Sequence, residues 1–218
     1  MPFAARHHTD PTRALAPLAG LEVRREQCSA TMAALQGRPE SDIQRRFDAG
    51  HRAYVAYLNE EAAAFGWVAT RSAEIGELGS TFAIPAGERY LWNFVTLAPF
   101  RGLGIYPRLV DAIVRRESRE AQRFWIAYAP ENHASGSGIR KAGFTDLAEL
   151  SFDAEGRPAL RSIVPGAAHV VSRLIGLPEA HDALAPCWRC VRAGRGVMYC
   201  APGQCQCDYQ VPASGCAA

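Results

Sequence analysis

The chain has 218 residues, of which 48% are hydrophobic and 21% are charged, which is enough apolar material for one sizeable core. Its 24 basic and 22 acidic residues leave a net charge of +2, so charge gives no reason to expect nucleic acid or an anionic membrane as a partner. The N-terminal segment lacks the apolar stretch of a secretory signal, and no apolar run approaches the roughly 20 residues of a membrane span. We therefore expect a cytoplasmic protein.

The first part of the chain predicts a lead-in followed by alternating strands and helices. Residues 1–18 read as a flexible lead-in, and the main domain is expected over residues 19–164. Alternating apolar residues predict strands, and apolar spacing of three and four residues predicts helices. The strands are expected over 21–24, 53–58 and 62–70, and the helices over 28–36 and 41–49.

The second part carries stronger patterns. An aromatic and β-branched strand leads through a glycine-bearing turn into an amphipathic helix, which an almost entirely apolar strand follows. The expected strands are 90–97, 124–129, 145–152 and 159–163, and the expected helices are 104–120, 132–141 and 167–177. This order predicts an α/β fold in which helices separate strands that pair in parallel.

The turn between residues 97 and 107 has the features of a phosphate-binding site. Gly102 and Gly104 remove the side chains that would hold an anion away from the backbone. A helix start presents unpaired N–H groups with a partial positive charge, and Arg101 adds a full charge beside them. The amides on offer are those of Leu103, Gly104, Ile105 and Tyr106.

Other phosphate-binding motifs do not fit this turn. A dinucleotide-binding turn has its third glycine where this chain has Pro107, and a P-loop ends in a Gly-Lys-Ser/Thr sequence that is absent. A tight strand–helix turn without any ligand is the simpler alternative for two glycines taken alone. That alternative stays open until a second motif is considered.

Two motifs together resemble the GNAT superfamily of acetyltransferases. Arg101 to Ile105 matches the family's pyrophosphate-binding pattern Arg/Gln-x-x-Gly-x-Gly/Ala. The stretch from Asn132 to Phe144 is similar to its later signature, in which a strand ends in Asn and a short helix closes in Lys-x-Gly-Phe. The resemblance covers about residues 20–163. It implies a mixed, mostly antiparallel sheet that is splayed in the middle, is flanked by helices and binds acetyl-CoA.

The resemblance also implies roles for individual positions. The backbone of Val95, Thr96 and Leu97 would hold the pantetheine arm, with the amide near Leu97 polarising the thioester carbonyl. Asn132 and Ser135 would contact the cofactor near its thiol. The reaction would be direct attack by a small-molecule or protein amine, without a covalent enzyme intermediate.

Two positions depart from the family pattern. Tyr106 stands where the family has a small residue, and its ring is expected to crowd the phosphate side of the turn. Ile139 stands where many members have a tyrosine acid. Either the thiolate leaves without that acid, or another group such as Tyr128 or a water supplies the proton.

An attacking amine must lose its proton, so a base is expected near the thioester. Glu88, just before the central strand, is the preferred base, and Glu131, after the following strand, is the second candidate. For both glutamates a solvated loop charge is an alternative that stays open. Trp92 and Asn93 are expected to line the acceptor pocket.

Six of the seven cysteines lie in the segment 165–218, which we treat as an appendage. Four thiolates suit a tetrahedral structural zinc ion, and a reducing cytoplasm favours metal over disulfides. A redox-labile or disordered tail, disulfides and an iron–sulfur cluster stay open. The expected ligands, spaced as C-x2-C-x9-C-x4-C, are Cys187, Cys190, Cys200 and Cys205, with Cys207 as a substitute.

Three functions follow from these patterns. The first is an acetyl-CoA-dependent N-acetyltransferase. The second is a GNAT-like module that binds CoA or acts as a scaffold, with a zinc-binding tail that contacts a macromolecule. The third, a zinc-ribbon nucleic-acid binder, is disfavoured by the near-neutral charge and the absence of a basic aromatic stripe. A homodimer stays open.

Overall fold

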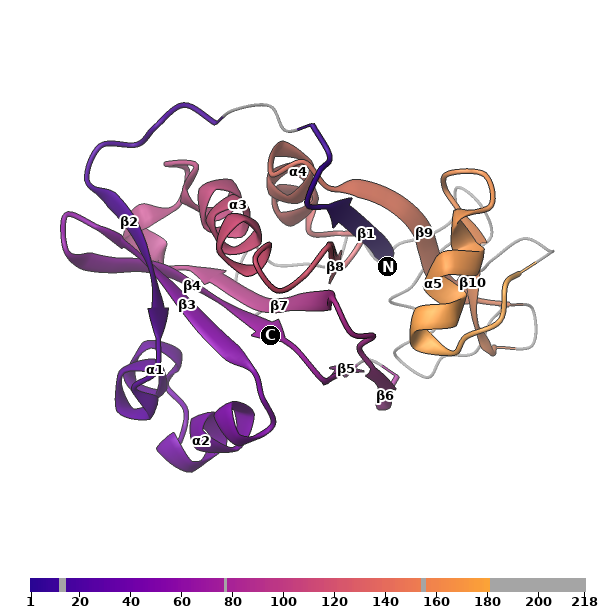
Figure 1. Cartoon of the computed structure of the whole chain (residues 1–218), viewed down its shortest axis with the longest axis horizontal. Helices are drawn as coiled ribbons and strands as arrows, with labels where there is room; N and C mark the ends of the chain where they lie inside the picture. The colour runs from indigo at the N-terminus through magenta and orange to yellow at the C-terminus, as the bar shows by residue number, and fades with distance from the viewer. Residues whose placement is uncertain (12–14, 77, 154–155, 181–218) are drawn as a thin grey trace, which may run out of the picture. The chain divides into compact units, whose positions relative to one another are not determined.

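The computed structural model describes residues 1–11, 15–76, 78–153 and 156–180 (Figure 1). They fall into two compact units, one formed by Phe3–Asp146 and the other by Met1–Pro2 with the described residues from 147 onward. No helix within the described ranges is long and apolar enough to cross a membrane. The cysteines predicted to bind zinc lie outside the described residues.

The larger unit is built on strands in the spatial order β1, β8, β7, β4, β3, β2. Their bounds are β1 Pro2–His7, β2 Leu21–Glu26, β3 Arg52–Leu58, β4 Glu61–Ala69, β7 Glu88–Thr96 and β8 Arg123–Ala127. Neighbouring strands in this order are antiparallel, except β7 and β8, which are parallel. The mixed, mostly antiparallel class is confirmed, and parallel pairing is confined here to one strand pair.

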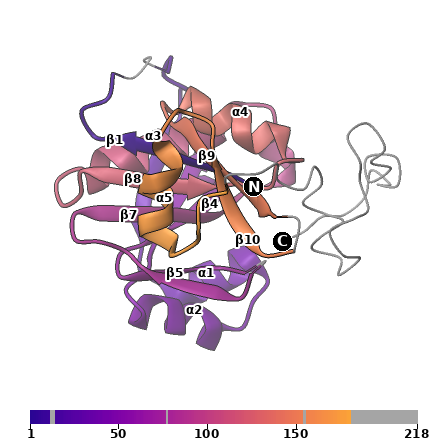
Figure 2. The same cartoon turned by 90° about the vertical axis from the view of Figure 1, so that its right-hand side faces the viewer.

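Helices cover both faces of these strands (Figures 1 and 2). The helices α1 (Ser29–Gln36) and α2 (Glu40–Asp48) lie on one face, and α3 (Ile105–Glu117) and α4 (His133–Lys141) lie on the other. The apolar face expected for this amphipathic helix is confirmed, since Leu109, Val110, Ile113 and Val114 are all buried. A short 3-10 helix, η1 (Ala98–Phe100), follows β7, and the small hairpin of β5 (Ser72–Ile75) and β6 (Ser80–Ala83) precedes it.

The prediction of a flexible lead-in is wrong for residues 2–7, which form β1 beside β8. Phe3 and Ala4 are fully buried. The Arg6 guanidinium donates to Asp111 at 2.9 Å and to the carbonyl of Ala142 at 2.8 Å. The strand escaped prediction because its sequence combines a proline, three alanine or arginine residues and a histidine, none of which favours strands.

The smaller unit contains the hairpin of β9 (Thr145–Phe152) and β10 (Pro158–Ser162), followed by α5 (Ala167–Ile175). The hairpin is antiparallel, with Pro158 opposite Phe152 and Ser162 opposite Ala148. The helix α5 buries an apolar face that includes Val171 and Ile175. The domain limits at residues 19 and 164 stay a prediction.

Candidate functional site

The strand β7 has a paired half and an open half. Its first residues pair in parallel with β8, from Glu88 opposite Arg123 to Leu91 opposite Ile126. Beyond Leu91, the part of the chain that the structure describes pairs β7 with β4 alone. All residues from Trp92 onward in β7 are partly exposed. The open edge is about 16 Å long, from five residues at roughly 3.3 Å each.

A bulge in β7 marks the start of the open edge. Asn93 has a φ of 50°, in the left-handed region that asparagine tolerates better than most residues. The register against β4 shifts here, opposite Gly66. A Cβ at Gly66 would lie 2.1 Å from the Phe94 ring, so the glycine is needed for this ring position. The bulge therefore changes the direction of the β7 side chains at the point where β7 separates from β8.

The backbone groups that face the opening differ from the expected ones. The Leu97 amide donates to the carbonyl of Ala63 at 2.9 Å, so it faces β4 and is occupied. The prediction that this amide polarises a thioester carbonyl is therefore wrong. Because successive residues of a strand point their backbone groups to opposite sides, Phe94 and Thr96 present theirs toward the opening. Val95 faces β4, opposite Phe65.

The turn after β7 starts α3 with two glycines in left-handed conformations. Gly102 has a φ of 81°, and Gly104, the N-cap residue of α3, has a φ of 70°. The amides of Ile105 and Tyr106 lie in the first turn of the helix, where N–H groups have no acceptor within the helix. The turn therefore brings together the predicted donors and the positive end of the helix dipole.

Two arginines lie beside this turn. Arg101 is exposed, and its Nε donates to the Thr96 carbonyl at 3.2 Å, at the end of the open edge. Arg108 was missed in the sequence, although it lies one helical turn after Gly104. Its Nη1 donates to the Gly104 carbonyl at 2.7 Å, and its Nη2 donates to Ala16 at 2.7 Å. Arg101 therefore joins the open edge to the turn by a contact that an anion would replace.

The Tyr106 ring does not crowd the turn as expected. It packs edge-on against Phe94, with ring centroids 5.5 Å apart, and a Cβ at Gly138 would lie 2.4 Å from it. Its hydroxyl lies 3.2 Å from the Ser135 Oγ. Burial raises the pKa of Tyr106 to about 12, so the hydroxyl stays protonated at neutral pH. Two hydroxyls thus lie together between the starts of α3 and α4.

The loop after β8 holds the remaining predicted residues. The Asn132 Oδ1 accepts from the Ser135 amide at 2.9 Å and caps α4, which leaves its Nδ2 as the group for a ligand. The Tyr128 hydroxyl lies 3.1 Å from both Asp146 carboxylate oxygens and accepts from Arg140 at 3.1 Å. Burial, followed by the Asp146 charge, raises the pKa of Tyr128. Glu131 directly precedes Asn132 and is partly buried.

Glu88 lies at the opposite end of β7 from the turn. Its carboxylate accepts from the Trp125 indole at 2.5 Å and pairs with Arg123 at 3.5 Å. Five residues of strand separate it from Asn93, or about 16 Å at roughly 3.3 Å per residue. The structure therefore does not bring Glu88 to the open edge.

Trp92 and Asn93, which were expected to line the acceptor pocket, lie on the α1/α2 side of the open edge, and their role stays a prediction. The Asn93 Nδ2 donates to the Gln36 Oε1 at 3.2 Å, and the Trp92 indole donates to the His51 Nδ1 at 3.0 Å. Because the indole only donates, Nδ1 is an acceptor and the His51 ring is neutral. Burial, followed by the charge of Arg46, lowers the pKa of His51. Gln36 and Arg46 were not recognised in the sequence.

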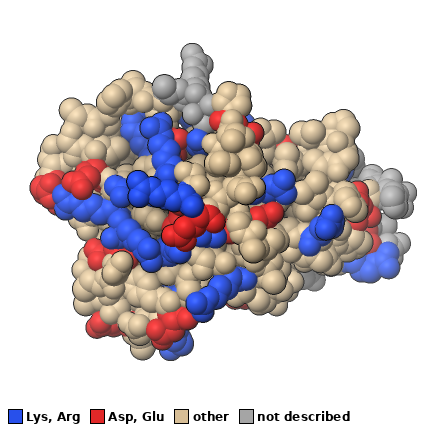
Figure 3. Space-filling model, in the orientation of Figure 1, with Lys and Arg blue, Asp and Glu red and all other residues tan. Residues whose placement is uncertain are grey.

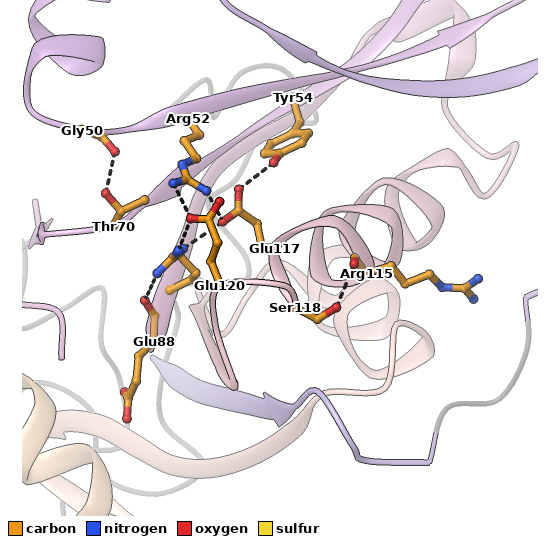
Figure 4. Close-up of polar contacts among 10 residues, drawn as sticks. Gly50, Arg52, Tyr54, Thr70, Glu88, Arg115, Glu117, Ser118 and Glu120 are labelled. Atoms are coloured by element: carbon orange, nitrogen blue, oxygen red, sulfur yellow. Dashed lines mark hydrogen bonds and ion pairs between the residues drawn. The ribbon is translucent and has the colours of Figure 1, made fainter. Parts of the chain in front are cut away.

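A separate hollow of about 340 Å³ lies near the end of α3 and is lined mainly by charged side chains. Glu117 lies at its base and accepts from Arg52 at 2.7 Å, Arg89 at 2.9 Å and Tyr54 at 2.6 Å (Figure 4). Basic and acidic side chains lie against one another on the face drawn in Figure 3. We interpret this network as structural, because it ties α3 to β3 and β7.

No protein-family model matches the sequence, and no curated protein matches it. Similar solved structures include a GCN5-related N-acetyltransferase from Kribbella flavida, with 16% identity and a TM-score of 0.46, over 66% of this chain and 53% of that chain. AAC(6')-Iy in complex with a bisubstrate analogue has 18% identity and a TM-score of 0.47, over 61% and 96%. The ribosomal-protein-S18-alanine N-acetyltransferase from Escherichia coli has 13% identity and a TM-score of 0.47, over 61% and 81%. The chain spans about half the length of the Kribbella protein.

Proposed function

We propose that the protein is an acetyl-CoA-dependent N-acetyltransferase of the GNAT type. The observation that carries the proposal is the continuity of two features. The open edge of β7 ends at Thr96, and the glycine turn with its helix start follows directly, joined to the edge by the bond from Arg101 to Thr96. A cofactor with a long polar arm and a diphosphate fits that sequence of backbone donors.

In this proposal the diphosphate binds the amides from Leu103 to Tyr106, and Arg101 leaves Thr96 to pair with it. The pantetheine arm lies along the open edge. The amide of Phe94 or Thr96, in place of Leu97, polarises the thioester carbonyl. The Asn132 Nδ2 contacts the cofactor arm near the thiol.

The amine attacks the thioester carbonyl directly, and the departing thiolate takes up a proton. We assign that proton to Tyr106, assisted by Ser135, because the Tyr128 hydroxyl is committed to Asp146 and Arg140. Its raised pKa keeps Tyr106 protonated at neutral pH, as a donor requires. Glu131 is retained as the base, since it adjoins Asn132 and Glu88 lies away from the open edge.

Calorimetric titration with CoA tests the cofactor site. Wild-type protein should bind CoA, and Arg101→Glu should bind at least about tenfold more weakly, since it loses one charge-assisted contact and adds a repulsive one. Arg173→Glu makes the same charge change on the exposed side of α5 and should bind like wild type. Absence of binding by wild-type protein, or equal effects of both variants, would contradict the proposal.

Release of free thiol from acetyl-CoA with a panel of amines tests the reaction. Turnover with any amine supports the transferase. Binding of CoA without turnover supports the alternative, a GNAT-like binding or scaffold module, which the isoleucine at position 139 favours. Tyr106→Phe should lower kcat and leave CoA affinity within about twofold, because the ring packing is kept and only the hydroxyl is lost.

We also propose that the cysteine-rich tail binds one structural zinc ion. Four thiolates from Cys187, Cys190, Cys200 and Cys205 would complete a closed tetrahedral site. Native mass spectrometry should detect one zinc per chain, and a Cys187→Ser, Cys190→Ser variant should lose it. Metal-free wild-type protein whose tail thiols all alkylate freely would contradict the proposal.

A further inference from the structure

Arg46 of α2 lies next to the point where β7 leaves β8. Its Nη1 donates to the Gln36 Oε1 at 2.9 Å, and the same oxygen accepts from Asn93 at 3.2 Å. Asn93 is the bulge residue at the start of the open edge. One glutamine side chain therefore separates the Arg46 guanidinium from the place where the proposed reaction occurs.

Two tryptophan rings flank this guanidinium. The Arg46 Cζ lies 4.8 Å from the centroid of Trp92 and 5.2 Å from that of Trp67. Trp67 is fully buried, and Trp92 is partly exposed on the acceptor side. Such stacking attracts the guanidinium to the ring faces and holds it in one orientation.

No carboxylate lies within ion-pair distance of Arg46 in the part of the chain that the structure describes, and Asp42, four residues earlier on α2, pairs with Arg45. By contrast, the buried Arg6 and Arg89 and the partly buried Arg52 each pair with a carboxylate. The hydrogen bond that the Arg46 Nη1 donates goes to a neutral amide oxygen. Burial, followed by the neighbouring charge of Arg38, lowers the pKa of Arg46, and the charge of Asp42 opposes this shift.

A half-buried arginine with free donors suits an anionic group of a ligand. One of its five N–H groups is used, and the remaining ones can form the parallel pair of bonds that a carboxylate accepts. A second cation, such as an additional ammonium group, would be repelled by Arg46 and Arg38. The acceptor side of the open edge therefore selects for negative charge close to the reacting amine.

We propose that the acyl acceptor is an amine that also carries a carboxylate, as an amino acid does, and that Arg46 binds this carboxylate. The inference rests on the proposed transferase function. The amine lies at the open edge beside Asn93, and the carboxylate lies against the guanidinium over Trp92. Arg46 acts in substrate specificity, and it takes no part in proton transfer.

Kinetics with matched acceptors test the inference. Each amino acid is compared with its own carboxamide, which keeps the amine and removes the negative charge. We expect the acid to have a kcat/KM at least about tenfold higher, the equivalent of about 1.4 kcal/mol. Arg46→Gln should remove this preference by raising the KM of the acid alone. Equal use of acid and amide by wild-type protein would overturn the inference.

Two further variants distinguish the loss of the Arg46 contact from a general loss of structure. Gln36→Glu changes one atom of the neighbouring side chain and places a carboxylate 2.9 Å from Arg46, which should occupy the guanidinium and abolish the preference in a folded protein. Arg115→Gln alters an exposed arginine of α3, which pairs with Asp111, and should leave the preference intact. A retained preference in Gln36→Glu, or its loss in Arg115→Gln, would overturn the assignment.

A binding measurement separates this inference from the proposed function. Trp92 and Trp67 flank Arg46, so a carboxylate that binds there should change tryptophan fluorescence without any turnover. Saturable changes with amino acids, absent with their amides and absent in Arg46→Gln, would support the site even if no thiol is released. If the tryptophan fluorescence of wild-type protein does not change with amino acids, either with or without CoA, the carboxylate site at Arg46 is overturned. The proposed transferase function is judged separately, by CoA binding and turnover.

Discussion

Gly102 and Gly87 have the same unusual backbone in different surroundings. Their φ angles are 81° and 77°, and a Cβ at either position would meet nothing within 4 Å. Alanine at either position should therefore lower the free energy of unfolding by about 1–2 kcal/mol through backbone strain. Only Gly102→Ala should also weaken CoA binding, because a methyl group there obstructs the approach of a phosphate to the turn.

Thermal denaturation and CoA titration of both variants measure these two effects. Gly87 precedes β7 and lies at the other end of the strand, so Gly87→Ala is a control matched in strain. Similar losses of CoA affinity in the two variants would mean that strain, and not the turn, explains the effect.

At this scale the sequence predicted the backbone better than the side chains. At Gly102 and Gly104, the order of strand, glycine-bearing turn and helix was predicted and is observed, with left-handed conformations at both glycines. The direction of the Tyr106 ring could not be predicted, because the space for it is made by Gly138 on another helix. The role of the Leu97 amide depends on its pairing with Ala63, and no local pattern reports which side of a strand an amide faces.

The end of α3 depends on Glu117, whose side chain is only 1% exposed. Burial raises the pKa of this carboxyl, but hydrogen bonds from Tyr54, Arg89 and Arg52 outweigh that effect, so the pKa is lowered from its ordinary value of 4.5. Glu117→Gln removes the buried charge that Arg52 and Arg89 share with the more exposed Glu120, and it should cost about 1–3 kcal/mol.

The same group makes stability depend on pH. Because the pKa is lower in the folded state, its contribution is complete above about pH 4.5 and is lost as the pH falls through the folded-state value. Urea unfolding between about pH 3 and 7 should show a shallower decline for Glu117→Gln than for wild type. Glu61→Gln, at an exposed position, should follow the wild-type curve. An unchanged decline in Glu117→Gln would exclude Glu117 as its source.

Elements with a regular apolar period were predicted within two or three residues of their observed limits. The helix expected over 104–120 is α3, and the strand expected over 90–97 is β7. The hairpin of β5 and β6 was missed because each strand has only four residues, too few for a period to be recognised. β1 was missed because tertiary pairing with β8 overrides the weak strand preference of its residues.

For the chain as a whole, β1 is a structural strand rather than an appendage. Phe3 is fully buried, whereas Ile163 is 48% exposed. Phe3→Ala should lower the free energy of unfolding by about 3–5 kcal/mol, while Ile163→Ala should change it by less than about 1 kcal/mol. Denaturant titration of the two variants measures the difference. A small effect of Phe3→Ala would mean that β1 is dispensable.

From the sequence, candidate residues could be named only for the proposed cofactor side of the site. The turn and Asn132 lie within continuous motifs, whose spacing can be compared with a known pattern. The acceptor side combines Gln36, Arg46 and Trp92 from three separate elements, and a single sequence contains no signal that these positions meet. Glu88 was chosen for its position in the chain, which gave no measure of its distance from the opening.

A strand edge that stays bare for a ligand is equally available to a strand from another molecule, which is the first step of aggregation. In β7 the bulge at Asn93 interrupts the regular series of donors and acceptors at the beginning of the bare stretch. A strand from another molecule could form only a few backbone hydrogen bonds in register with β7 before the turn at Gly102. Under the proposed function, the bulge at Asn93 therefore has a second effect, because it also limits pairing of β7 with a strand from another molecule.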